Sequence, residues 1–269
     1  VLRRLPGITV SDAGQISYKG QPIKNFYIEG LDLMKGRYGI ATNNIDPNSI
    51  STIEVLENHQ DIKALKDLKP EERASINLKL KSGVKGVFNL IATLGGGYVD
   101  KLLWDNELIT TYFQRNSQLL ATYKGNNSGT DLESELRSHT DYDYSRTSTI
   151  SDIAMPATPG INKRYYYFNQ SHSATYNQVF RVGKNGELGI NAAYLNDRDE
   201  RSNQSVTTTL LPDGSKNVVD ESFNGILHRN IANGNITYMQ NTERNYIKEQ
   251  LKFDWLSTDG YSNIYAGED

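Results

Sequence analysis

Histidine and cysteine are the side chains through which this chain could do metal or nucleophilic chemistry. Its 269 residues contain four histidines and no cysteine, which excludes thiolate zinc sites and disulfides and leaves the redox compartment open. His59, His139, His172 and His228 lack the short spacing of a zinc motif, and no nucleophile elbow or phosphate-binding motif occurs. The sequence therefore predicts no catalytic residue, no metal site and no cofactor, and favours a protein that is not an enzyme.

Acidic and glycine-rich segments offer two further kinds of chemistry. Carboxylates in predicted loops could bind calcium, whose preferred ligands are oxygen atoms, but their spacing does not match a calcium loop and a solvated loop face is favoured. Gly95-Gly96-Gly97 could cradle a phosphate, yet no helical pattern follows it, so a glycine-rich strand end is favoured. The acidic residues concerned are Asp141, Asp143, Asp197, Asp199 and Glu200.

Tyrosine is the outlying residue type. The chain has 17 tyrosines and 7 phenylalanines, and a ring that is half apolar and half polar suits membrane interfaces and sugar-binding walls. If the ligand is a glycan, we expect stacking on Tyr38, Tyr98, Tyr142 and Tyr144. The alternative for each of them is an ordinary tyrosine of a loop or of an interfacial girdle.

Bulk properties restrict the class of protein. The net charge of -3 and the absence of clustered Lys and Arg give no support for a nucleic-acid partner. No run of about 18 apolar residues occurs, so no transmembrane helix is expected. The mean hydropathy of -0.60 does not exclude a transmembrane β-barrel, because one face of each strand is polar there.

The first part of the chain is predicted to be a small α+β unit that ends in a strand at Ala74–Lys81, where Ile76, Leu78 and Leu80 should form a buried face and the intervening residues a wet one. Glycines then break the chain at residues 83–86, which marks a domain boundary. The earlier elements are a hairpin around 19–22, a helical turn capped by Asp46 before a strand at 52–56, and a helix over 61–68.

The second part is predicted to be entirely β. About seven segments of alternating polarity follow Lys85, and their connections alternate between short and long, as the turns and loops of an outer-membrane barrel do. The short connections are 115–116, 183–186 and 240–243, and the long ones are 126–163 and 198–220. Residues 223–239 keep neither face apolar, and a bulge near Gly234 would explain this.

One face of these strands is predicted to contact lipid, because its side chains are apolar and those of the opposite face are polar. This face comprises Leu119, Ala121, Tyr123, Leu188, Ile190, Ala192, Tyr194, Leu251, Phe253 and Trp255. Aromatic residues near strand ends are expected to form interfacial girdles, and they are Trp104, Tyr112, residues 165–168 and Trp255.

Three segments of the first part resemble a known family: VLRRLPGITVSDAGQISYKGQPIKNFYIEG, NSISTIEVLENHQ and ASINLKLK. In this order they resemble the plug domain of TonB-dependent outer-membrane receptors, particularly of the SusC-like branch, over Val1–Lys81. The sequence departs from the family at Glu57-Asn58-His59-Gln60, where a glycine-rich turn is usual.

The resemblance implies an α+β plug domain at residues 1–82 and the N-terminal portion of a β-barrel at 83–269, which is incomplete because a plugged barrel of this type needs roughly 22 strands. It also implies import of a glycan, siderophore or peptide, and location in the outer membrane. The implied partners are TonB, through a segment upstream of Val1, a lipoprotein lid, the imported ligand and outer-membrane lipid. The alternative is a non-transporting surface protein for glycan binding or adhesion.

Overall fold

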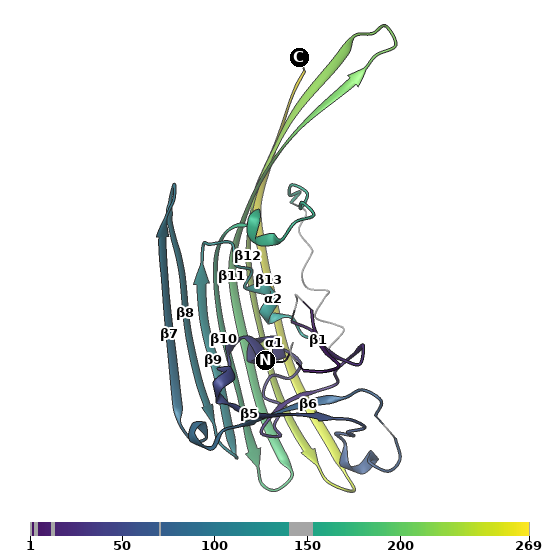
Figure 1. Ribbon diagram of the computed structural model, residues 1–269, viewed down its shortest axis with the longest axis vertical. Coiled ribbons are helices and arrows are strands. Elements are labelled where there is room, and N and C mark those ends of the chain that lie inside the picture. Colours follow the sequence, from purple (N-terminus) through teal and green to yellow (C-terminus); the bar gives the residue numbers. More distant parts are fainter. Residues whose placement is uncertain (1, 3–4, 12–13, 70, 140–152, 269) are drawn as a thin grey trace.

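A seven-stranded antiparallel sheet, here called the wall, dominates the computed structural model, which describes residues 2, 5–11, 14–69, 71–139 and 153–268 (Figure 1). Each strand of the wall pairs with its neighbours in sequence, in the order β13-β12-β11-β10-β9-β8-β7. The strands are β7 Phe88–Tyr98, β8 Leu102–Phe113, β9 Ser117–Asn126, β10 Phe168–Val182, β11 Gly186–Leu210, β12 Lys216–Asn241 and β13 Tyr246–Glu268. The predicted number of strands is confirmed.

The connections follow the predicted alternation in part. The short turns after β8, β10 and β12 lie at one end of the wall, here called the short-turn end, and the long connection after β9 lies at the other. The predicted long connection at 198–220 is wrong, because β11 and β12 stay paired up to Leu210 and Lys216. The β-branched run at Val206–Thr209 favours this ladder over a loop. The turn itself is short and includes Gly214, whose φ is +84°.

The predicted bulge at Gly234 is also wrong. The register of β11 with β12 and of β12 with β13 passes through this residue without a shift, since Gly234 is opposite Ala192 on one side and Phe253 on the other. The outer-face positions of β12 include the polar residues Asn224, His228 and Asn230, and these residues, not a bulge, explain its mixed pattern.

The outer face of the wall carries three consecutive cross-strand rows that contain no Asp, Glu, Lys or Arg. Directly paired residues of antiparallel strands share a face, so the register defines each row. From β7 to β13 the rows are Phe88, Tyr112, Leu119, Gln178, Ile190, Ile236 and Leu251; then Leu90, Thr110, Ala121, Tyr176, Ala192, Gly234 and Phe253; then Ala92, Leu108, Tyr123, Ala174, Tyr194, Ala232 and Trp255. All residues that the sequence assigned to the apolar face, apart from Leu188 in the adjacent row, belong to these rows.

The inner face of the wall is polar at the same height. The row between the first two outer rows consists of Asn89, Thr111, Leu120, Asn177, Asn191, Asn235 and Lys252. Asn177 and Asn191 are buried there and bonded to each other, with 2.9 Å between the amide nitrogen of Asn191 and the amide oxygen of Asn177. The wall is therefore an amphipathic sheet, apolar outside and polar inside.

The N-terminal unit, residues 2–82, lies against the inner face of the wall (Figure 1). It contains two three-stranded sheets, ordered β1-β2-β3 and β4-β6-β5, and one helix of seven residues. Its elements are β1 Ile8–Val10, β2 Ile16–Tyr18, β3 Gln21–Pro22, β4 Phe26–Ile28, α1 Tyr38–Asn44, η2 Pro47–Ser49, β5 Ile50–Leu56, η3 Lys63–Leu65 and β6 Ser75–Leu80. The turn η4, Ser82–Val84, leads from the unit to the wall.

The predicted α+β class is wrong, because strands make up 59% and helices 10% of the described residues and no α+β plug domain is evident. The helix expected over 61–68 is reduced to the single turn η3, and Leu68 is 79% exposed, so its apolar spacing does not reflect a buried helix face. The expected hairpin is shorter than predicted, since β3 has two residues and the following strand, β4, joins the other sheet.

Two local predictions in this unit are confirmed. The Asp46 side chain accepts a hydrogen bond from the backbone N–H of Asn48 (2.8 Å) and caps η2, with Pro47 at the first position. Strand β6 matches the predicted strand, but the face expected to be wet is largely buried: Asn77 is 5% exposed. The reason is that β6 is the central strand of its sheet and Asn77 bonds Glu54 and the backbone N–H of Gly30.

The core lies between the N-terminal unit and the wall. Apolar residues of the unit, such as Ile16, Ile28 and Met34, form one buried cluster with Leu120, Leu195 and other residues of the inner face. In the described part of the chain, no helix is long and apolar enough to cross a membrane.

Candidate functional site

The N-terminal unit is bonded to the wall by side-chain amides. Gln118 on β9 donates to the carbonyl oxygen of Ile28 (2.8 Å), and Asn191 on β11 donates to that of Leu33 (2.8 Å). Both side chains are at most 1% exposed. A cation also takes part, since the Arg37 guanidinium donates to the amide oxygen of Asn233 on β12 (2.6 Å). The polar inner face therefore holds the unit mainly through single hydrogen bonds.

A buried cluster of charges fixes the long connection after β9, here called the outer loop (127–167, described at 127–139 and 153–167), to the wall. The Arg229 guanidinium on β12 binds Glu133 of the outer loop (2.9 Å) and Asp197 on β11 (2.5 Å). The hydroxyls of Tyr167 and Ser171 donate to the same carboxylate. Because buried charges need partners, these contacts hold the loop in one position.

The outer loop also contacts the N-terminal unit. The short helix α2, Glu133–Leu136, carries Glu135, which binds Lys124 on β9 (2.8 Å) and accepts a bond from Asn43 on α1 (3.3 Å). The His139 ring lies 4.8 Å from the Tyr38 ring, centroid to centroid, and burial, together with Arg137, lowers the pKa of His139. Loop, wall and unit thus meet around α2.

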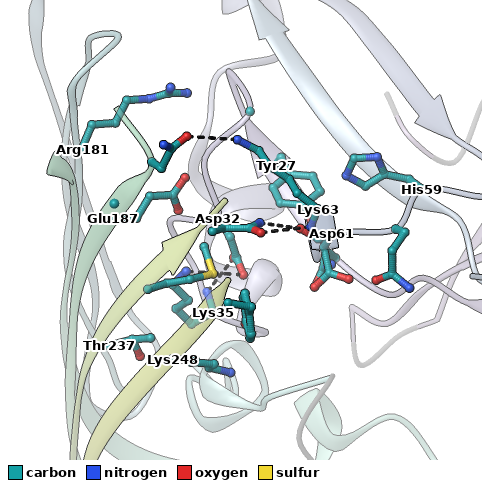
Figure 2. Close-up of a pocket in the computed structure, with 18 of the residues that line it drawn as sticks. Tyr27, Asp32, Lys35, His59, Asp61, Lys63, Arg181, Glu187, Thr237 and Lys248 are labelled. Carbon is teal, nitrogen blue, oxygen red and sulfur yellow. Dashed lines mark hydrogen bonds and ion pairs between the residues drawn. The ribbon is translucent and has the colours of Figure 1, made fainter. Parts of the chain in front are cut away.

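A cavity of about 390 Å³ separates the N-terminal unit from the wall at the short-turn end (Figure 2). The unit contributes Tyr27, His59, Asp61 and Lys63 to one side, and β10 to β13 contribute the other side. The wall side chains labelled in Figure 2 are Arg181, Glu187, Thr237 and Lys248. This volume is within the range of about 300–1,000 Å³ that is usual for ligand pockets.

An ion pair holds Asp61, one of the residues that line this cavity. Lys24 binds both Asp61 and Glu71, the latter at 2.6 Å. Burial alone would lower the pKa of Lys24, but the hydrogen bonds to the two carboxylates outweigh it and raise the pKa. Burial would raise the pKa of Glu71, but the hydrogen bonds from Lys24 and Arg73 outweigh it and lower the pKa of this carboxyl. These two shifts keep Lys24 and Glu71 charged at neutral pH.

The cavity can bind or pass a polar molecule. Its lining mixes carboxylates, amines, amides and the Tyr27 ring, and burial raises the pKa of Tyr27, which keeps its hydroxyl neutral. Within the described residues, no group of three or more His, Asp or Glu side chains could hold a metal ion.

The structure does not bring the predicted tyrosines together. Tyr38 is 1% exposed in the core, and its hydroxyl oxygen accepts a bond from the backbone N–H of Ile16 (3.1 Å), so contact with a ligand would require the unit to move. Tyr98 is 77% exposed at the end of β7 and is accessible. Tyr142 and Tyr144 lie outside the described residues. A role for these four residues in glycan binding stays a prediction.

The acidic residues considered for calcium are separated as well. Asp197 and Asp199 were expected in a loop, but they lie on the inner face of β11 and are bound to Arg229 and Arg201 respectively. Glu200, also in β11, binds Arg198. Asp141 and Asp143 lie outside the described residues.

No pattern in the sequence predicted the residues that line the cavity. Residues such as Tyr27 and Glu187 are far apart in sequence. They line the same cavity only because the unit lies against this part of the wall. The departure at Glu57–Gln60 was the available signal, since His59 and Gln60 line the cavity.

Comparisons with known proteins give weak similarities. No family model and no curated protein matches the chain. Among solved structures, it is similar to the alcaligin outer-membrane receptor FauA from Bordetella pertussis, with 13% identity, a TM-score of 0.25 and coverage of 99% of this chain and 44% of that one. It is also similar to the FpvAI–pyocin S2 complex, with 12% identity, a TM-score of 0.28 and coverage of 98% and 39%.

The chain spans less than half the length of these structures. Scores this low carry no argument about what the chain does.

Proposed function

We propose that the wall is the membrane-spanning part of an outer-membrane β-barrel receptor that imports a ligand, and that the N-terminal unit occupies its lumen. The observation that carries this proposal is the difference between the two faces of the wall. Its outer face has three rows without charged residues, and its inner face at the same height is rich in asparagine. Lipid excludes unpaired charges, whereas a barrel lumen is polar.

The length of the uncharged outer face, here called the outer band, supports a lipid contact. On β11, the outer-face positions from Gly186 to Asn196 carry no Asp, Glu, Lys or Arg, and this length is close to the roughly 9–11 residues that a tilted membrane strand needs. Aromatic residues lie at both borders of the band, as they do at the two interfaces of a bilayer. They are Phe88, Tyr112, Phe180 and Tyr238 towards the short-turn end, and Trp104, Tyr123, Tyr194 and Trp255 towards the other.

The finer assignments follow from the sequence resemblance and are part of the proposal. Residues 1–82 form the unit that blocks the lumen, and residues 83–269 form part of the barrel, whose two edge strands, β7 and β13, pair with further strands. The receptor is of the TonB-dependent, SusC-like kind, with TonB and a lipoprotein lid as partners. The ligand is a glycan, a siderophore or a peptide.

A surface adhesin is the competing function. An adhesin has no need for a folded unit on the polar side of the wall, where the unit fills space that a ligand would otherwise cross. The position of the unit, together with the cavity between it and the wall, therefore favours an importer.

The test is fractionation of cells that make the full-length protein, followed by electrophoresis with and without boiling. We expect the protein in the outer membrane, and we expect its band to shift on heating, because a closed barrel resists detergent until it is boiled. A soluble protein without a heat shift would contradict the proposal.

A further inference from the structure

We propose that two asparagines of the short-turn end, Asn185 and Asn241, form a latch on the N-terminal unit, and that its opening frees the unit and enlarges the cavity. The inference rests on the proposed function in one respect: the unit must move for a ligand to cross the lumen. The latch is defined by the bonds of these asparagines to residues 61–63.

The latch consists of three hydrogen bonds. The side-chain oxygen of Asn241 accepts from the backbone N–H of Lys63 (3.0 Å), while its amide nitrogen donates to the carbonyl oxygen of Asp61 (2.6 Å). The Lys63 amine donates to the side-chain oxygen of Asn185 (3.3 Å). The Asn241 side chain thus accepts one hydrogen bond from the backbone of the unit and donates another to it, as a backbone peptide group would.

The opposite end of the unit is held through the outer loop. Glu135 of α2 accepts a hydrogen bond from Asn43 of the unit (3.3 Å), and α2 is itself fixed to the wall by the ion pairs of its carboxylates with Arg229 and Lys124 (2.9 and 2.8 Å), whose charges are largely withdrawn from solvent. Among the described residues, no ion pair joins segment 57–69 to the turns at 183–185 and 242–245. The two bonds of Lys63 in the latch are exposed and adjoin the cavity, whereas the contact at the opposite end is fixed by buried ion pairs, so the latch opens first.

Between the two ends, the unit is held by the apolar core and by hydrogen bonds to side-chain amides of the wall. Gln118 and Asn191 each give the unit one amide hydrogen bond, but their side-chain oxygens, Oε1 and Oδ1, are buried without a hydrogen-bond partner in the described structure. Buried unpaired oxygens favour separation, because water would satisfy them. The cavity beside the latch removes further contacts on that side.

The test is hydrogen exchange of the full-length protein with Asn185→Leu and Asn241→Leu combined, which removes the amides at similar side-chain volume. We expect exchange to accelerate by about tenfold or more in segment 57–69 and also in residues 26–37, which contact the wall. The matched control is Asn196→Leu, which removes an amide bond to Asn230 on the outer face (2.7 Å) and should leave both segments unchanged.

Acceleration confined to segment 57–69 would overturn the proposal, since the asparagines would then tether a loop and not the unit. An unchanged exchange rate in both segments would overturn it as well. This measurement does not depend on transport, so it separates failure of the latch from failure of the receptor assignment, which the fractionation experiment reports.

Discussion

Replacing Ala192 by Arg is expected to destabilise the full-length protein in lipid by about 2–4 kcal/mol, the range for a cation on the lipid face near the middle of a membrane strand. Ala192 lies in the middle outer row, between Tyr176 and Gly234, and its side chain is exposed. The measurement is the free energy of unfolding in vesicles, obtained from urea titrations.

The control for this variant is Thr208→Arg, on the part of β11 that extends past the end of β10. Thr208 is also exposed, and we expect a change within about 0.5 kcal/mol there, as for surface substitutions in general. Equal, small effects of both variants would show that water, not lipid, surrounds Ala192.

Replacing Arg229 by Met is expected to destabilise the protein by about 3–5 kcal/mol, because it leaves the carboxylates of Glu133 and Asp197 buried without their cation. Of the two ion pairs that join the described part of the outer loop to the wall, this variant removes one, so we expect a protease to cleave between residues 127 and 167 much faster than in the unmodified protein. Unfolding titrations and timed proteolysis measure the two effects.

Arg198→Met is the matched control. Arg198 pairs with Glu200 on the same strand (3.1 Å), but the two side chains are 34% and 48% exposed, and a surface pair of this kind contributes about 0–1 kcal/mol. If both Arg variants accelerated loop cleavage equally, the buried cluster would not be what holds the outer loop.

The strands of the wall could be predicted from the sequence because the alternation of apolar and polar residues along a strand is a local signal. The apolar residues at 188, 190, 192 and 194 define the outer face of β11 without any knowledge of its neighbours, and the register then places Ile236 and Leu251 beside Ile190. The extension of β11 past Glu200 was missed because its polar residues resemble a loop, although Val206 and the threonines after it favour a strand.

The N-terminal unit and the candidate site were predicted less well, because they depend on contacts between distant segments. The spacing of Ile62, Leu65 and Leu68 is helical, yet this segment is held by Asn241, 178 residues away from Lys63, and forms a single turn. Asn77 is polar but buried, since Glu54 and the Gly30 backbone satisfy its amide. No local pattern contains these partners.

The central claim is that the outer face of the wall contacts lipid, and depth-dependent fluorescence quenching tests it most directly. The chain has no cysteine, so Ala192→Cys provides a single labelling site for a fluorophore, and Thr208→Cys provides the control. In vesicles containing brominated lipids, we predict strong quenching of the label at 192 and none at 208. Equal, weak quenching at both positions would contradict the claim.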